Sequence, residues 1–586
     1  MYRPENSDNA DRTEEQPPPR GAGHGPQRAK SSGFPRRNFL RGGSLLAVGA
    51  MLPTTAAAAS AAPGAGAGTG GAPVNLVVDG AANGRVIPRD FTGLSFERGA
   101  LNAGNAGVQG YFFSPENSEL VRLFQNAGIR NVRVGAGTAD QQIPPGTGPD
   151  GYTGVDKLFQ FAAASDISVS YGMRLYNPSN QPLPNLMADD AAAARYIWQR
   201  YSKSLSSFSI GNEPDWHSFH ASDPAIFETT PGNPGSAYPS YLEDWRKFAA
   251  AVQEAAPNAL ISGPDTGNYG TRGGLPYVTF TPDAATGISW TQKFAQDEAM
   301  SHRIKDATQH VYVGGSPLST TAAQAIDNML SREWVENDQI GTQPAGTGSG
   351  VSAYAPLPWL DKRIVAPTVA TGLPVRLSES NDYLTGVPGA SDRFAAALWA
   401  LDYMHWWAAR GVSGVNFHNK QWLYTDTITP ALGTYTPLAG TCGPSGCGGY
   451  RVSPKGYAIK AFDLGAQGQV KPITMANASD VNLTAYAVGN DRDLYVTVIN
   501  KTHGAAGIEA RVNIEPRNFG CTEAAVLTLE AGEPGDPSSE TATLGGEAIS
   551  NNAPWQGKWA PLSLDGRGHL ALSIRATTAA VIRLRR

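Results

Sequence analysis

The chain has 586 residues, more than one hydrophobic core usually organises, so we expect two folded domains and tails. Apolar residues make up 41% and charged residues 17%, with 67 Gly and 43 Pro, which excludes a coiled coil or a disordered chain. The formal net charge of -5 and the pI near 6.0 provide no basic surface, so nucleic acid is not an expected partner.

The N-terminal region has the features of an export signal. The segment Pro35-Arg36-Arg37-Asn38-Phe39-Leu40-Arg41 matches a twin-arginine pattern, and a weakly apolar stretch and small residues up to Ala62 follow it. The alternative is a disordered tail with a chance arginine pair. We expect residues 1–62 to be a signal region and residues 63–73 a Gly/Ala-rich linker. No later stretch approaches the roughly 20 apolar residues of a membrane span. Because the twin-arginine route exports proteins, we expect a periplasmic or extracellular protein after signal removal.

Residues 74–455 show the alternation of strands and helices that is typical of an α/β barrel. Eight short β-rich runs alternate with longer helical or loop segments, which predicts parallel strands in a (β/α)8 TIM barrel. The clearest helix extends from Ser391, a candidate N-cap, to Gly411, a candidate stop. The predicted strands are Phe91 to Glu97, Asn131 to Gly135, Ile167 to Leu175, Ser207 to Gly211, Ala259 to Gly263, Thr308 to Val313, Val375 to Ser378 and Gly414 to Phe417.

Residues 456–586 change to short segments of period 2 without intervening helices, which predicts an antiparallel β-sandwich. The clearest of them is Asp493 to Asn500. The segment 74–88 precedes the first barrel strand, and its run Val74 to Val78 is a further candidate strand of this sandwich. The other predicted strands are Leu483 to Val488, Ile508 to Ile514, Ala525 to Leu529, Leu570 to Ile574 and Ala580 to Leu584.

The three cysteines are too few for a disulfide scaffold. Cys442 and Cys447 are close enough in sequence to form a loop staple after export, whereas Cys521 has no histidine nearby and is expected to be an isolated thiol. A zinc site needs about four ligands, and no second cysteine pair or histidine cluster lies nearby. We therefore predict no metal site.

Acidic residues follow several of the predicted strands. Glu97 ends the first strand, Asp140 follows the second, Asn212-Glu213 follows the fourth and Glu379 follows the seventh. Because the carboxyl ends of barrel strands meet at one mouth, these groups should converge there, where each is costly to bury without a ligand or partner.

Two carboxylic acids at a barrel mouth suit glycoside hydrolysis, which needs a proton donor and a nucleophile. Asn212 stands where an amide can bind a sugar 2-OH, so Glu213 is the candidate acid/base and Glu379 the candidate nucleophile. Arg376 either favours the ionised form of Glu379 or points away from it. Asp140 has the alternative role of a helix N-cap, and Glu97 that of an ion-pair partner for Arg98 or Arg133.

The order of these motifs resembles clan A glycoside hydrolases and, more closely, family 79, the heparanase and β-glucuronidase family. The resembling segments are Phe91 to Glu97, Val132 to Asp140, Ile210 to Asp215, Gln309 to Tyr312, Leu377 to Asn381, Ser391 to Trp399 and Val415 to His418. The resemblance implies a barrel with a C-terminal β-sandwich and a retaining double displacement without a cofactor. It also implies that Glu97 and Asp140 hold sugar hydroxyls and that Tyr312 faces the nucleophile.

The substrate is expected to be a β-D-glucuronide, with a neutral β-galactoside or β-glucoside as the alternative. Family members that bind glucuronic acid use a Tyr and Gly-rich backbone shortly after the nucleophile. Here Tyr383 is kept, adjacent glycines are absent, and Asp382 would repel a uronate if it faced inward. Other classes are a catalytically silent carbohydrate-binding barrel, against which the two glutamates argue, and a redox enzyme, suggested only by the export signal. The oligomeric state is left open.

Overall fold

The computed structural model describes residues 72–103, 110–139, 146, 150–175, 183–217, 238–267, 285–300, 303–314, 320–338, 356–419, 434–443 and 446–586. The predicted signal region, the linker up to residue 71 and the candidate site residue Asp140 lie outside the described residues. Among the described helices, none combines the length and the apolar character that crossing a membrane requires.

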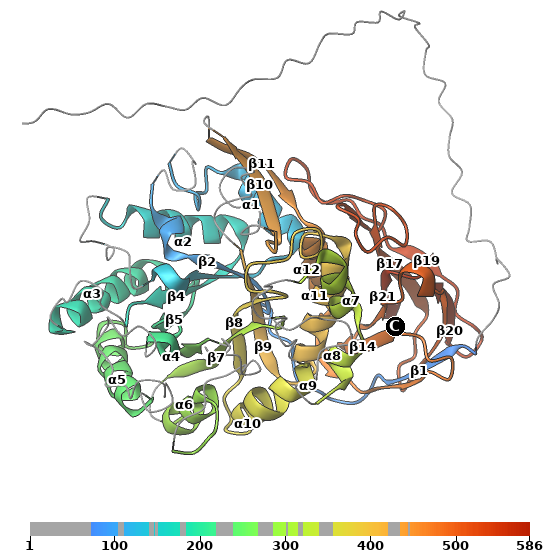
Figure 1. Cartoon of the computed structure of the whole chain (residues 1–586), viewed down its shortest axis with the longest axis horizontal. Coiled ribbons are helices and arrows are strands. Elements are labelled where there is room, and N and C mark those ends of the chain that lie inside the picture. Colours follow the sequence, from blue (N-terminus) through green and yellow to red (C-terminus); the bar gives the residue numbers. More distant parts are fainter. Residues whose placement is uncertain are drawn as a thin grey trace, which may run out of the picture. The chain divides into compact units, whose positions relative to one another are not determined.

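Eight parallel strands close into a barrel, which confirms the predicted fold class (Figure 1). β2 pairs with β3 on one side and with β9 on the other, so the first and last strands close the ring. The strands are β2 (Thr92–Glu97), β3 (Asn131–Gly135), β4 (Ser168–Met173), β5 (Leu205–Ile210), β6 (Ile261–Thr266), β7 (Ile304–Tyr312), β8 (Val375–Asn381) and β9 (Val412–His418).

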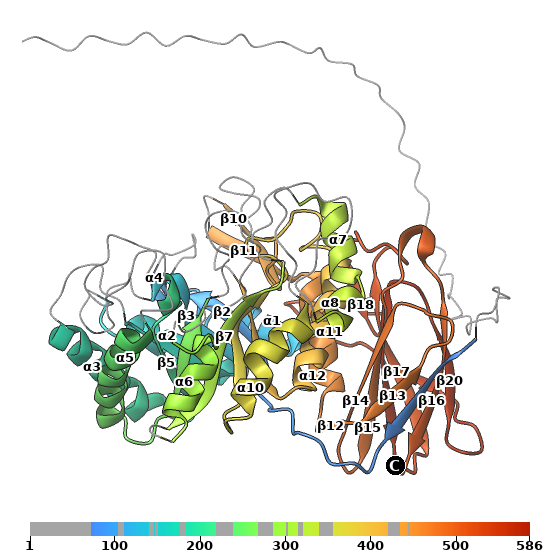
Figure 2. The same cartoon turned by 60° about the horizontal axis from the view of Figure 1, so that its bottom comes forward.

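The barrel strands are almost entirely buried, because the ring is filled by side chains on the inside and covered by helices on the outside (Figures 1 and 2). The longer helices are α1 (Ser118–Ala127), α2 (Thr153–Ser165), α3 (Leu183–Tyr201), α5 (Tyr238–Ala255), α6 (Trp290–Glu298), α7 (Ala322–Leu330), α11 (Phe394–Ala408) and α12 (Pro454–Gly465). Short helices are α4 (Pro214–His217), α8 (Glu333–Glu336), α9 (Leu357–Leu360) and α10 (Ala366–Val369).

Helix α11 begins later than the sequence indicated. Its N-cap is Arg393, and no side chain caps it, whereas the Ser391 hydroxyl accepts a hydrogen bond from the Val387 backbone N–H in the preceding turn. The prediction of Ser391 as the cap was therefore wrong. Every residue of α11 is buried, so tertiary packing stabilises this helix without a capping side chain.

The C-terminal region forms a β-sandwich of two sheets. One sheet has the order β13-β1-β16-β20 and the other β12-β14-β15-β21-β17-β18, with β19 on β17. All neighbours in both sheets are antiparallel except β1 and β16, which run parallel. The strands are β1 (Val74–Asp79), β12 (Gln469–Lys471), β13 (Ile473–Ala476), β14 (Leu483–Gly489), β15 (Asp493–Asn500), β16 (Ala510–Arg517), β17 (Glu523–Ala531), β18 (Ala542–Leu544), β19 (Ala560–Leu562), β20 (Leu570–Ile574) and β21 (Thr578–Arg585).

Strand β15 shows how the sandwich is held against the barrel. It alternates apolar and polar residues, yet all eight of its residues are buried. Leu494, Val496 and Val498 face the core between the two sheets, whereas Tyr495 and Ile499 belong to the core that the barrel shares. Both faces of this sheet are thus covered. A strand of period 2 usually exposes one face to solvent, whereas here the second face packs against the barrel.

A hairpin of β10 (Leu438–Gly443) and β11 (Gly446–Val452) separates the last barrel strand from α12. Cys442 and Cys447 are register partners in this hairpin, and the staple between them stays a prediction. Cys521 is a half-buried free thiol.

Candidate active site

The carboxyl groups of Glu213 and Glu379 meet at the C-terminal end of the barrel strands. Glu213 follows β5, and Glu379 lies near the C-terminal end of strand β8. One ligand atom each of Glu213, His310 and Glu379 lie within 4.8 Å of one another. The Glu379 side chain is 8% exposed, whereas that of Glu213 is 15% exposed. The two acids predicted from strand position are therefore brought together, in unequal surroundings.

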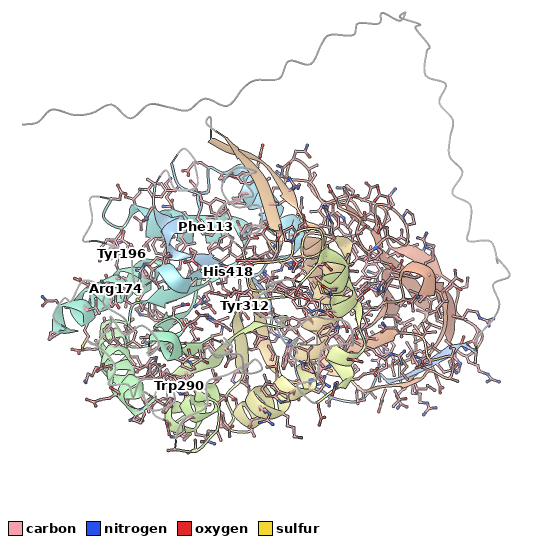
Figure 3. The ribbon with its side chains drawn as sticks, viewed as in Figure 1. Phe113, Arg174, Tyr196, Trp290, Tyr312 and His418 are labelled. Carbon is pink, nitrogen blue, oxygen red and sulfur yellow. The ribbon has the colours of Figure 1, made fainter. Side chains whose placement is uncertain are left out.

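Glu379 has a hydrogen-bond donor on each carboxylate oxygen. The Tyr312 hydroxyl donates to Oε1 at 2.7 Å, and the Arg133 guanidinium donates to Oε2 at 2.9 Å. His418 Nδ1 lies 3.7 Å from Oε2, and Figure 3 labels Tyr312 and His418 in the middle of the barrel. Burial alone would raise the pKa of Glu379, but the electrostatic effects of His418, His310 and Arg133 and the tyrosine hydrogen bond lower it to about 2. Glu379 is thus kept ionised.

Arg133 is a site residue that the sequence suggested only as a partner for Glu97. It lies on β3 and is 1% exposed. Besides its bond to Glu379, the guanidinium donates to Asn212 Oδ1 at 2.7 Å and to Asp265 Oδ2 at 3.1 Å. The sequence holds one signal for this role, because Arg133 is a charged residue between two valines in a predicted strand. Arg133 therefore holds the candidate nucleophile and the amide before Glu213 in one network.

Glu213 is held by its backbone and by a histidine. Its φ of 48° lies in the left-handed region, which is costly for a residue with a side chain and is typical of functional sites. The Glu213 backbone N–H donates to the Asp265 carbonyl oxygen at 2.8 Å. Nδ1 of His310, a fully buried residue on β7, lies 2.7 Å from Glu213 Oε1. These contacts aim the Glu213 carboxyl group toward Glu379.

Asp265 on β6 is a second site residue that the sequence did not indicate. It is fully buried, and its own φ is 54°. Its carboxylate accepts hydrogen bonds from the Ser209 and Ser378 hydroxyls, both at 2.5 Å, in addition to that from Arg133. Burial would raise the pKa of Asp265, but the Arg133 charge, the nearby His310 and the Ser209 hydrogen bond hold it well below its usual range.

Glu97 is bound at one of its two carboxylate oxygens. Its Oε2 accepts from the Thr138 backbone N–H at 2.9 Å and from the Thr138 hydroxyl at 2.7 Å. Its Oε1 lies 3.7 Å from His418 Nε2, and 27% of the side chain is exposed. The ion pairs with Arg98 or Arg133, the alternative role of Glu97, are absent from the described contacts of Glu97. His418 therefore lies between Glu97 and Glu379.

Asp382 and Tyr383, which follow Glu379 in sequence, are both buried. Tyr383 is 1% exposed, and its hydroxyl accepts a hydrogen bond from Asn328 of α7, so it packs in the core in this conformation. Asp382 is fully buried and forms an ion pair with Lys455 at 3.2 Å. The negative charge of Asp382 is compensated within the protein, which removes the predicted repulsion of a uronate. The role of Tyr383 in substrate binding stays a prediction.

Arg376 points away from Glu379, which is the second of the two orientations considered for it. Its guanidinium donates to Asn416 Oδ1 at 2.8 Å and to the Asp90 carbonyl oxygen at 2.8 Å, near the N-terminal ends of the strands. Asp140 lies outside the described residues, so its predicted role is not tested.

The carboxylates and His310 are also the group within the described residues whose spacing would suit a metal ion. Both oxygens of Glu379 already accept from Arg133 and Tyr312, and the Arg133 guanidinium supplies the positive charge of the network. The ligands of a divalent metal direct free lone pairs at one point. Because Arg133 and Tyr312 already donate to the two oxygens of Glu379, the site suits an organic substrate better than a metal ion.

The fold, a closed parallel barrel with an attached β-sandwich, is one that solved glycoside hydrolases share. A solved 4-O-α-L-rhamnosyl-β-D-glucuronidase from Fusarium oxysporum aligns with a TM-score of 0.58 and 17% identity, over 87% of this chain and 99% of that one. A bifunctional glucanase-xylanase from a metagenome library aligns with a TM-score of 0.56 and 14% identity, over 88% of this chain and 99% of that one. At such identities the likeness shows the shared fold.

A more specific likeness is to a β-glucuronidase from Aspergillus niger, which is 23% identical over 311 residues. The match covers 50% of this chain and 47% of the relative, so the chain spans about half the length of the curated relative it matches. No family model matches the chain. The resemblance to β-glucuronidases noted in the sequence is confirmed, since a relative and a structural neighbour carry that name.

Proposed function

We propose that this protein is a retaining β-glycoside hydrolase with Glu379 as the nucleophile and Glu213 as the acid/base. The observation that carries the proposal is the approach of the two acids, whose nearest ligand atoms lie within 4.8 Å. Retaining enzymes hold their carboxyl groups about 5 to 5.5 Å apart, whereas inverting enzymes need about 6.5 to 9.5 Å to admit a water molecule.

The surroundings of each acid support its role. A nucleophile must be ionised, and the pKa of Glu379 is lowered to about 2 by its cationic neighbours and by the Tyr312 hydrogen bond, which outweigh the effect of burial. An acid/base must exchange protons with the leaving group and with water. Glu213 is the more exposed of the two, with one oxygen at His310. Unequal environments of this kind separate the roles of paired carboxyl groups.

In the proposed reaction, Glu379 Oε attacks the anomeric carbon while the Glu213 carboxyl group protonates the departing glycosidic oxygen. Glu213, now a carboxylate, then removes a proton from water, and the resulting hydroxide displaces Glu379 from the sugar. Asn212 is placed by Arg133 and would bind the sugar 2-OH, and Glu97 would accept a bond from another hydroxyl. The Tyr312 hydroxyl donates a hydrogen bond to Glu379 and stabilises its carboxylate before attack.

The substrate we propose is a β-D-glucuronide, supported by the names of the relative and of the structural neighbour. The buried Asp382–Lys455 pair removes the charge argument against it. A neutral β-galactoside or β-glucoside is the second candidate. The observation that favours it is that Arg133 and Lys455, cations near the nucleophile segment, are each already bound to a carboxylate.

The test is a panel of 4-nitrophenyl β-D-glucuronide, β-D-galactoside and β-D-glucoside with the wild type, Glu379→Ala and Glu213→Ala. Glu254→Ala, an exposed carboxylate on α5, is the matched control. Glu379→Ala should lose turnover, and added azide should restore it with an α-glycosyl azide as product. Glu213→Ala should lose up to about 10²- to 10⁴-fold, with the smaller losses on these 4-nitrophenyl substrates, whose leaving group needs little protonation, and with added azide it should form a β-glycosyl azide. Turnover that survives unchanged in Glu379→Ala would contradict the assignment.

We also propose export by the twin-arginine route, for which the support is the Arg36-Arg37 motif and the apolar and small residues after it. Fractionation of cells that express the full chain should find activity outside the cytoplasm. The double variant Arg36→Lys, Arg37→Lys should retain it inside, and equal export of both chains would contradict the proposal.

A further inference from the structure

Beneath the two candidate catalytic acids lies a buried histidine–aspartate pair, formed by His310 and Asp265. Both residues are fully buried, and His310 Nε2 lies 3.7 Å from Asp265 Oδ1. On the other side of the ring, His310 Nδ1 lies 2.7 Å from Glu213 Oε1. Within the described part of the chain, Nε2 has no partner at hydrogen-bond distance. The imidazole is therefore held between two carboxyl groups, one at each nitrogen.

Four charged groups on or next to other barrel strands act on His310. Glu213 follows β5, Asp265 lies on β6, Glu379 on β8 and Arg133 on β3. Three of these four groups are carboxyl groups. Arg133 is bound to Glu379 at 2.9 Å and to Asp265 at 3.1 Å, so its charge is shared between two of them. The ring thus lies in a negative environment although it is excluded from water.

We propose that Asp265 is a positioning residue that keeps His310 doubly protonated throughout the catalytic cycle, so that the imidazolium stabilises whichever of Glu213 and Glu379 is ionised. The inference rests on the proposed function and deepens it. In the first step of that reaction the negative charge leaves Glu379, which becomes an ester, and arises on Glu213. A fixed cation within 4.8 Å of both carboxyl groups stabilises the charge before and after this transfer.

The proton balance leaves His310 unchanged. In the first step the Glu213 proton moves to the glycosidic oxygen, the bond from the anomeric carbon to that oxygen breaks, and the bond to Glu379 forms. Glu213 is left as a carboxylate that accepts from Nδ1–H. In the second step Glu213 takes a proton from water, the hydroxide bonds to the anomeric carbon, and the Glu379 ester bond breaks. Both ring N–H groups remain in place, Nε2–H directed at Asp265.

The electrostatics agree with this geometry. Burial alone would lower the pKa of His310, yet the carboxylates around it, Glu379 foremost, raise that pKa to about 9. Asp265→Asn removes the negative charge and keeps the size of the side chain, so it should lower the pKa of His310. A neutral imidazole could then donate from only one nitrogen, and Glu213 would lose the cation beside it.

The experiment compares the wild type with Asp265→Asn in two measurements. The first is the NMR titration of histidine rings labelled with ¹³C, where His310→Gln identifies the resonance among the nine histidines. The second is the pH dependence of kcat on a β-glycoside that the wild type hydrolyses. We expect a wild-type midpoint near 9 and a midpoint lower by about one unit or more in Asp265→Asn. The alkaline limb of kcat should move by the same amount, with a loss of about tenfold or more at the optimum.

Ser378→Ala is the matched control, because it removes a hydrogen bond from the same Asp265 oxygen and leaves the charge. It should leave the His310 midpoint and the alkaline limb in place. An unchanged His310 midpoint in Asp265→Asn, or equal effects of both variants, would overturn the inference. If Asp265→Asn does not fold, the wild type alone decides: a His310 titration midpoint below pH 7 would overturn the inference. The NMR titration needs no substrate, so its outcome is separate from that of the proposed function, which fails if the wild type hydrolyses no β-glycoside.

Discussion

Replacement of Arg133 by methionine would remove one buried positive charge from two buried carboxylates. The Asp265 side chain is 0% exposed and that of Glu379 is 8% exposed, and both accept from the Arg133 guanidinium. Methionine is of similar length and apolar, so it fills much of the space and leaves the carboxylates without their partner. Breaking a buried ion pair by removal of one member costs about 3–5 kcal/mol, and we expect Arg133→Met to destabilise the protein by that amount.

The same substitution should change the ionisation of Glu379. Arg133 is one of the side chains whose electrostatic effect outweighs burial and lowers the pKa of Glu379, so its loss should raise that pKa part of the way toward the ordinary value. The nucleophile must be ionised, and the acid limb of kcat/KM should therefore move to higher pH. Arg133→Lys keeps the charge and loses the forked geometry, so it should lie between the wild type and Arg133→Met.

The assay for stability is guanidinium unfolding of the wild type, Arg133→Met, Asp265→Asn and the double variant. The double variant no longer contains the Asp265 charge that Arg133→Met leaves unpaired, so it should be more stable than Arg133→Met alone. Strict additivity of the two substitutions, or an Arg133→Met protein as stable as the wild type with an unmoved acid limb, would refute the reasoning.

Three further predictions concern single contacts. Tyr312→Phe removes a hydrogen bond to an ionised carboxylate worth about 1.5–3 kcal/mol, so kcat should fall about tenfold to hundredfold, with thermal unfolding as the check that the fold is intact. Lys501→Met removes the ion-pair partner of the buried Asp402 on α11, which should lower the unfolding free energy by about 3–5 kcal/mol. Well below the unfolding temperature, kcat/KM should be unchanged, and a large loss of activity at that temperature would contradict the prediction. The pKa of His310 is raised to about 9 in the folded protein, so its contribution to stability is complete below its ordinary pKa of 6.5 and is lost as the pH rises to 9. The unfolding free energy, measured with denaturant across this range, should therefore depend less on pH in His310→Gln than in the wild type. An equal dependence on pH in both proteins would count against the raised pKa.

Much of the barrel could be predicted because it depends on local pattern. All eight predicted barrel strands overlap the observed ones, and Asn131–Gly135 has the predicted bounds. Short β-branched runs between helical segments leave few alternatives to parallel pairing, and parallel pairing in turn places Glu213 and Glu379 at the same end. The carboxylate pair was accessible to sequence reasoning for this reason.

The partners of that pair were not accessible in this way. Arg133 and Glu379 are separated by 246 residues, and His310 and Glu213 by 97, so each contact exists only after the ring has closed. Nothing in the neighbourhood of Asp265 along the chain marks it as a partner of Arg133. Its role arises from strands that are not adjacent in sequence.

The segments around the nucleophile separate what the sequence determined from what the tertiary structure decided. Composition and order of residues were enough for a barrel, a sandwich and two acids at one mouth, because strand period and strand direction are local properties. Whether Asp382 repels a uronate depended on Lys455, and which way Arg376 points depended on Asn416 and Asp90. Charges act through space in a medium of low dielectric constant, so their effect on the site is decided by folded distances and burial, which separation along the chain does not specify.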